Sequence, residues 1–162
     1  MTQNVQRCAE ISLPALQTLL GAYGLQVAML PENADIPGSY WGAPEAGLVL
    51  DTLYIRPDTP THSALHEAGH WICMDDARRA KLHTDAGGTV LEECAVNYLQ
   101  ILLAEALPDV GREQMLRDMT TWGYSYREGS VYAWLEGDAA DAIAWLQQRG
   151  LIDAQRQRIT HR

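Results

Sequence analysis

The chain has 162 residues, 47% of them hydrophobic, and a net charge of −9 at pH 7. This length is enough for a core without disulfide or metal staples, so we expect one domain over residues 1–162. A surface of this charge repels phosphate backbones, which argues against direct binding to nucleic acid.

The first part of the chain predicts a helix and then three short strands. Residues 11–23 carry leucines at helical spacing behind a serine cap, and a glycine ends the pattern. Residues 25–30, 47–50 and 53–55 have the composition of strands, the last two joined by a tight turn. We expect a small, mostly antiparallel sheet, with one of the last two strands at an edge where an extended peptide can pair.

The next predicted helix carries the sequence H-E-A-G-H. Thr59-Pro60 gives it a start, with a hydroxyl cap and then proline at the first helical position. His66 and His70 are four residues apart and share one face, so they can point two imidazole nitrogens at one zinc ion. Glu67 lies at the flank of that face, where its carboxylate can take a proton from a water at the metal. The motif therefore predicts metal-assisted hydrolysis, provided that a third ligand exists.

The helix predicted over residues 89–107 offers that ligand. Thr89 and Glu92 have the spacing of a capping box, in which the Glu92 carboxylate reaches back to the cap. Glu93 is then free for the metal, and Asn97 lies on the same face, where it can orient a ligand histidine through the second ring nitrogen. A solvated carboxylate is the ordinary role of a lone glutamate, but this helix is otherwise apolar.

Other candidate ligands fit less well. Cys73 lies about 10 Å along the helix from His66, too far for one ion to bridge, and Asp76 lacks the glycine turn that a third ligand at its position needs. His62 is one turn before His66, either near the site or simply a polar residue in the first helical turn. Four residues are candidates to stabilise an oxyanion: His83, Tyr124, Tyr126 and Arg127.

The remaining segments complete an α+β prediction. Residues 75–88 are polar and glycine-ended and are predicted as a loop, residues 111–122 as a helix, and residues 138–149 as a last helix capped by Asp138. Residues 124–137 fit no single pattern. The core is thus expected over residues 11–108, and residues 109–162 form a C-terminal helical extension.

The compartment is indicated by three features of the sequence. The three cysteines are odd in number and widely spaced, which is typical of a reducing compartment and not of a disulfide framework. Residues 1–10 are polar and lack the apolar stretch of a signal peptide. The longest apolar stretch, residues 95–107, is too short to span a bilayer and carries polar side chains. We therefore expect a cytoplasmic protein without a membrane partner.

The residues around the motif resemble a known family. Glu93 and Asn97 form the pattern E-x-x-x-N, followed by an apolar run over residues 98–107 and by Pro108. Together with H-E-x-G-H and the preceding helix and strands, this arrangement resembles the ImmA/IrrE family of gluzincin-type zinc metallopeptidases. The resemblance covers roughly residues 11–108, and the zinc motif is its specific part.

The resemblance implies a zincin-like fold and a Zn²⁺-dependent endopeptidase, often one that cleaves a transcriptional repressor. The ligands are then His66, His70 and Glu93, the catalytic base is Glu67, and the partner is a protein or peptide substrate. The alternative is a zinc-binding interaction module without turnover. Glu67 favours the peptidase, because a structural zinc site needs no base.

Overall fold

The computed structural model describes residues 4–39, 42–81, 89–124, 131–137 and 139–160. Its one named sheet has the strand order β1-β3-β2, with β1 over Gln26–Met29, β2 over Gly47–Val49 and β3 over Thr52–Ile55. The pair β1–β3 is parallel and the pair β2–β3 is antiparallel. The fold is α+β as expected, but the sheet is mixed. The chain passes from β1 to β2 at the opposite edge, and β3 then returns to the central place, parallel to β1.

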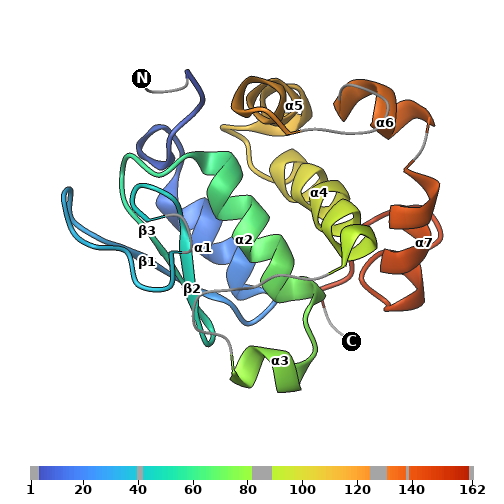
Figure 1. Ribbon diagram of the computed structural model, residues 1–162, viewed down its shortest axis with the longest axis horizontal. Helices are drawn as coiled ribbons and strands as arrows, with labels where there is room; N and C mark the ends of the chain where they lie inside the picture. Colours follow the sequence, from blue (N-terminus) through green and yellow to red (C-terminus); the bar gives the residue numbers. More distant parts are fainter. Residues whose placement is uncertain (1–3, 40–41, 82–88, 125–130, 138, 161–162) are drawn as a thin grey trace.

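Helix α1, over Leu13–Gly21, packs beside β1 (Figure 1). Ser12 caps it by accepting a hydrogen bond from the Ala15 N–H at 3.2 Å, and proline in the first turn costs no helical hydrogen bond. Leu16 and Leu20, four residues apart, are fully buried. The helix predicted at this place is therefore confirmed, with its cap and its apolar stripe.

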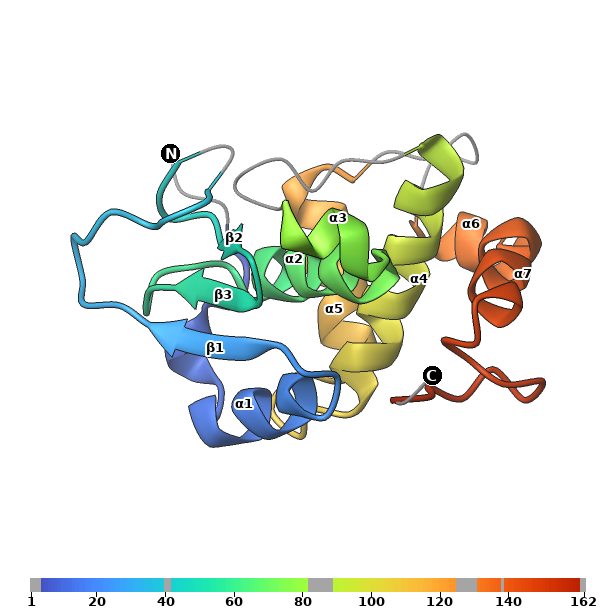
Figure 2. The same ribbon diagram turned by 90° about the horizontal axis from the view of Figure 1, so that it is seen from below.

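Helix α2, over Thr61–Cys73, lies between the sheet and helix α4 (Figures 1 and 2). All of its residues are buried except His66 and Glu67. Its start differs from the prediction by one residue, because Pro60 takes the N-cap position. The Thr59 hydroxyl accepts from the Arg56 N–H at 2.8 Å and is not available as a cap.

Helix α4, over Val90–Glu105, runs antiparallel to α2, and Gly69 of α2 lies against Val96 of α4. A Cβ placed on Gly69 would lie 3.0 Å from Val96 Cγ1. Thr89 caps α4 as predicted, since its hydroxyl accepts from the Glu92 N–H at 3.1 Å. The glycine of the motif thus lets the two helices meet at a distance that a larger residue would increase.

The helices beyond α4 lie around it, the first of them against α2 as well and the last on the side of α4 that faces away from the sheet (Figure 1). They are α5 over Gly111–Trp122, α6 over Val131–Gly137 and α7 over Ala140–Gln148, of which α5 and α7 contact α4 directly. The N-cap of α7 is Ala139, whereas Asp138, the predicted cap, lies outside the described residues. In the described part of the chain, no helix has both the length and the apolar character that crossing a membrane requires.

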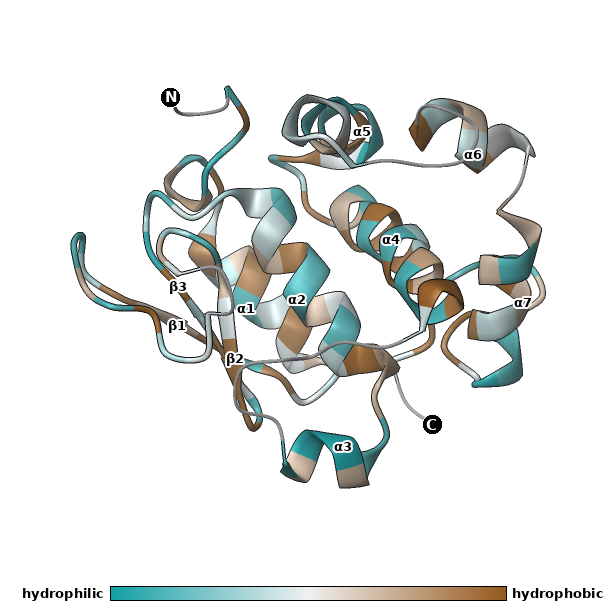
Figure 3. Ribbon diagram, viewed as in Figure 1, coloured by the Kyte–Doolittle hydropathy of each residue, from teal (hydrophilic) through white to brown (hydrophobic). Residues whose placement is uncertain are grey.

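Part of the segment predicted as a loop is helical. Helix α3, over Asp76–Ala80, is capped by Asp75, whose carboxylate accepts from the Arg78 N–H at 2.8 Å. Its largely hydrophilic surface in Figure 3 and its lack of buried residues explain why no apolar period predicts it. Residues 82–88 of the same predicted loop lie outside the described residues.

The outer edge of β2 is not open to a peptide. The backbone of residues 37–39 lies against it so closely that a Cβ on Gly38 would lie 2.2 Å from the Leu48 carbonyl oxygen. A Cβ on Gly47 would likewise lie 2.1 Å from the Pro37 carbonyl oxygen, and Gly38 has a φ of +74°. The expected strand pairing with a substrate at this edge is therefore wrong, because the chain itself occupies the position.

Candidate metal centre

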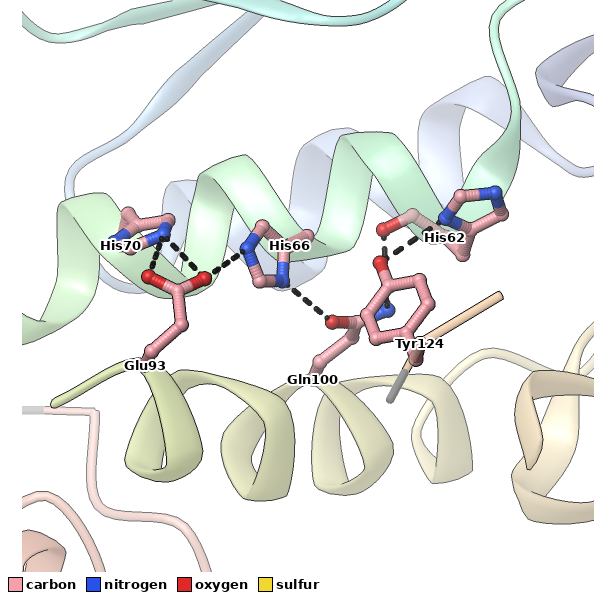
Figure 4. A network of polar contacts seen from close by, with 6 residues as sticks. All are labelled: His62, His66, His70, Glu93, Gln100 and Tyr124. Carbon is pink, nitrogen blue, oxygen red and sulfur yellow. Dashed lines mark hydrogen bonds and ion pairs between the residues drawn. The ribbon is translucent and has the colours of Figure 1, made fainter. Parts of the chain in front are cut away.

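The structure brings His66, His70 and Glu93 together, as the sequence predicts (Figure 4). His66 Nε2 lies 2.7 Å from Glu93 Oε1. His70 Nε2 lies 3.2 Å from the same oxygen and 3.1 Å from Oε2. Two turns of α2 therefore present both imidazoles to one carboxylate at the first turn of α4.

The charges of this group support one another. Burial favours the neutral form of Glu93, but hydrogen bonds and charges from His66 and His70 outweigh it and hold the pKa of Glu93 well below its usual range. Burial lowers the pKa of His66, yet the hydrogen bond and the charge of Glu93 more than compensate, so that this pKa is raised. Glu93 is therefore ionised at neutral pH, and its carboxylate oxygens are suited to bind a metal ion.

Glu67 lies beside the ligands without belonging to them. Burial raises the pKa of its carboxyl, opposed by the charges of His66 and His70 and assisted by those of Glu93 and Glu45. Among the described residues, no hydrogen bond or ion pair engages its carboxylate. A carboxylate that is more basic than usual and has no fixed partner is suited to accept a proton.

The Glu92 side chain points away from the candidate metal ligands, as the helix register predicts, but it does not contact the partner that the capping box predicts. Its carboxylate does not return to the Thr89 cap and instead pairs with Arg78 of α3, at 3.0 Å from the guanidinium Nη1. The Glu92 side chain is 8% exposed, whereas that of Arg78 is 38% exposed. The sequence gives no sign of this ion pair, because α3 itself is not predicted.

The residue in contact with the second ring nitrogen of a candidate ligand histidine is Gln100 and not Asn97. Gln100 Oε1 lies 2.9 Å from His66 Nδ1 (Figure 4). Within the described residues, Asn97 Oδ1 and His70 Nδ1 are both buried without a hydrogen-bond partner. Gln100 lies about one turn beyond Asn97 in α4. The only feature of the sequence that could have pointed to it is that it is a single amide within the apolar run of residues 98–107.

The other candidates lie outside the ligand group. His62 is buried beside Tyr124, whose hydroxyl is 3.1 Å from His62 Nδ1. Cys73 is buried in the core, and the Asp76 carboxylate is fully exposed in α3. The Tyr124 ring packs against His66, with 5.8 Å between the ring centroids. Because its hydroxyl already contacts His62, Tyr124 does not fit the role of an oxyanion donor. The remaining oxyanion candidates lie outside the described residues: His83, Tyr126 and Arg127.

The three ligand atoms suit a metal ion in number, kind and position. They all lie within 4.8 Å of one another and comprise two imidazole nitrogens and one carboxylate oxygen. In the parts of the chain that the structure describes, no fourth histidine, cysteine or carboxylate joins them. The side chains of Glu93 and His66 are 43% and 17% exposed, so the group opens to solvent on one side. Three ligands with an open position are the arrangement of a catalytic metal site, whereas structural sites are closed by four.

Comparison of the chain with protein-family models, with curated proteins and with solved structures finds no match. The site is therefore interpreted from its own geometry.

Proposed function

We propose that this protein is a zinc-dependent metallopeptidase of the gluzincin type. The metal would be held by His66, His70 and Glu93, a donor set of imidazole and carboxylate that suits zinc. The observation that supports catalysis best is the state of α2, in which His66 and Glu67 are the two residues that are only partly buried. A helix that served only to bind metal would have no need to leave Glu67 accessible beside the ligands.

Bound zinc would supply a Lewis acid that polarises the scissile carbonyl and lowers the pKa of water to about 7. Glu67 then acts as general base and accepts the proton of the attacking water on its carboxylate. The same carboxyl group passes that proton to the nitrogen of the departing amine, which completes the cleavage. The raised pKa of Glu67 suits both roles.

The substrate would be a protein or peptide, and the resemblance to the ImmA/IrrE family makes a transcriptional repressor a reasonable choice to test. Because residues 37–39 cover the edge of β2, strand pairing at that edge is not part of this proposal. A zinc-binding interaction module without turnover is the alternative that the experiment must separate.

Replacing Glu67 by glutamine tests the proposal, because the amide keeps the shape of the carboxylate and cannot accept the proton. We expect the Glu67→Gln variant to bind one zinc ion per chain and to lose hydrolysis by a factor of about 10² to 10⁴. Zinc content would be measured by mass spectrometry of the native protein, and cleavage by screening a synthetic peptide library.

Two results would contradict the proposal. Cleavage by Glu67→Gln at the wild-type rate would remove the general base from the mechanism. Zinc binding by both proteins, with no cleavage by the wild type of the library or of repressor proteins, would favour the interaction module.

A further inference from the structure

Gln100 is a buried amide in the middle of an apolar helix face. Gln100 is 0% exposed, and its chain neighbours Leu99 and Ile101 are also buried. Burying an amide without hydrogen bonds costs free energy, so such a residue is expected to have its polar atoms engaged. The contacts of both ends of this amide therefore indicate what it does.

The main chain of α2 fixes which way the amide points. Gln100 Nε2 lies 3.2 Å from the His62 carbonyl oxygen, which can only accept a hydrogen bond. The same nitrogen lies 3.3 Å from Met115 Sδ and 3.4 Å from the Tyr124 hydroxyl, both able to accept. The amide nitrogen therefore belongs on this side, and the opposite orientation would set two carbonyl oxygens against each other.

This orientation leaves Oε1 facing His66. The oxygen can only accept, so at 2.9 Å it requires the proton of His66 to be on Nδ1. Without a metal, Nε2 is protonated as well and donates to Glu93 at 2.7 Å. When the ring gives up that proton to bind a metal, the one that remains is on Nδ1, and Nε2 carries the lone pair. The hydrogen bond thus selects the tautomer that presents Nε2 to the ligand group.

The support for Gln100 comes partly from residues beyond the expected core. Tyr124 follows helix α5, and its hydroxyl lies between Gln100 Nε2 and His62 Nδ1 (Figure 4). The His62 ring also packs against Trp122, with 4.8 Å between the ring centroids. Residues of the C-terminal extension therefore enclose the amide on the side away from the metal ligands.

We propose that Gln100 is a positioning residue, which holds His66 in the tautomer and the ring orientation that bind a metal through Nε2. His70 has no equivalent, because its Nδ1 is buried without a partner among the described residues. The inference rests on the metal site of the proposed function and does not depend on peptidase activity.

The first test compares a variant of Gln100 with a control that loses a buried hydrogen bond outside this network. Gln100→Met keeps the length of the side chain but replaces the amide oxygen by a thioether, which is at most a weak acceptor for His66. The control is Ser63→Ala in α2, which removes a hydroxyl that accepts from the Ala46 N–H at 3.1 Å. We expect the zinc affinity of Gln100→Met, measured by competition with a chelator, to fall about 10- to 100-fold. Ser63→Ala should bind zinc nearly as well as the wild type, although both variants lose buried hydrogen bonds.

A third variant and a spectroscopic measurement separate positioning from stability. Gln100→Glu restores an acceptor to His66 Nδ1 without the donor to His62, so it should recover most of the zinc affinity that Gln100→Met loses. Nitrogen-15 NMR of the zinc-loaded wild type should show His66 coordinated through Nε2, with the proton on Nδ1.

The outcomes are distinct from those for the proposed function. If the wild type binds no zinc, both the metal site and this inference are wrong. If the wild type binds zinc and Gln100→Met binds it equally well, this inference alone is wrong. Coordination of His66 through Nδ1 in the wild type would also overturn it, even if no variant folded.

Discussion

Glu92 and Glu93 are adjacent in α4, yet their carboxylates serve different parts of the molecule. Adjacent helical residues point about 100° apart, so one carboxylate meets the histidines of α2 while the other meets Arg78 of α3. The capping residue Thr89 fixes this register by accepting from the Glu92 N–H. A single hydroxyl at the helix start therefore decides which glutamate can reach the metal.

Removing the two carboxylates in turn should separate metal binding from stability. Glu93→Ala should weaken zinc binding at least about a hundredfold, because one of three ligands is lost. Glu92→Ala should keep its zinc affinity but lose about 1 kcal/mol of unfolding free energy, since the ion pair that the buried Glu92 carboxylate makes with the part-exposed Arg78 is lost. Chelator competition and urea denaturation measure the two effects. Loss of zinc in Glu92→Ala with unchanged affinity in Glu93→Ala would reverse the assignment.

At the scale of elements, the close contact of α2 with α4 explains which parts of the site the sequence could predict. The H-E-x-G-H motif and the Thr89 cap are local patterns, so the three candidate ligands follow from spacing and capping within each helix. The choice between Asn97 and Gln100 does not, because it depends on where α4 crosses α2. Helix α3 has no buried residues, so no apolar period predicts it. Residues 37–39 cover the edge of β2 through a contact between segments that the strand pattern does not pair.

The contact at Gly69 can be tested by adding a single methyl group. Gly69→Ala places a Cβ 3.0 Å from Val96 Cγ1, so the Val96 side chain or α4 must give way by a few tenths of an ångström. We expect a loss of about 1–3 kcal/mol of unfolding free energy together with weaker zinc binding. Gly21→Ala in α1 is the matched control, because nothing lies within 4 Å of its Cβ. There the change should stabilise the helix by about 0.5–1 kcal/mol. Thermal unfolding in the presence of a chelator measures both, and equal behaviour of the two variants would contradict the close-contact argument.

At the scale of the whole molecule, the N-terminal segment connects parts that are distant in sequence. The Thr61 N–H donates to the Gln6 carbonyl at 2.9 Å, and the Cys8 N–H donates to the Thr59 carbonyl at 2.8 Å. The Gln6 N–H also donates to the Asp118 carboxylate of α5 at 3.2 Å. The start of α2 is therefore fixed by residues that precede the expected core at residue 11, and periodicity cannot predict such long-range backbone bonds.

The buried thiol of this segment should make global stability depend on alkaline pH. Burial raises the pKa of Cys8 from 9.0 to about 12, opposed by a hydrogen bond with Thr61 and assisted by the charge of Asp58. Between these values the unfolded chain loses the thiol proton while the folded chain keeps it, so the unfolding free energy falls as pH rises. By pH 11 the wild type should lose roughly 2 to 3 kcal/mol more than Cys8→Ala, relative to each protein at pH 8. Urea denaturation across this range measures the difference, and parallel pH profiles would contradict it.

The antiparallel pairing of α2 and α4 also sets two opposed dipoles at the metal ligands. His70 lies in the last turn of α2 and Glu93 in the first turn of α4. The carbonyl end of α2 carries a partial charge of about −0.5, which attracts a cation to the histidines. The amide end of α4 carries about +0.5, which favours the ionised form of Glu93. The backbone therefore favours a bound cation beside the histidines and an ionised carboxylate at Glu93, before any side-chain contact is formed.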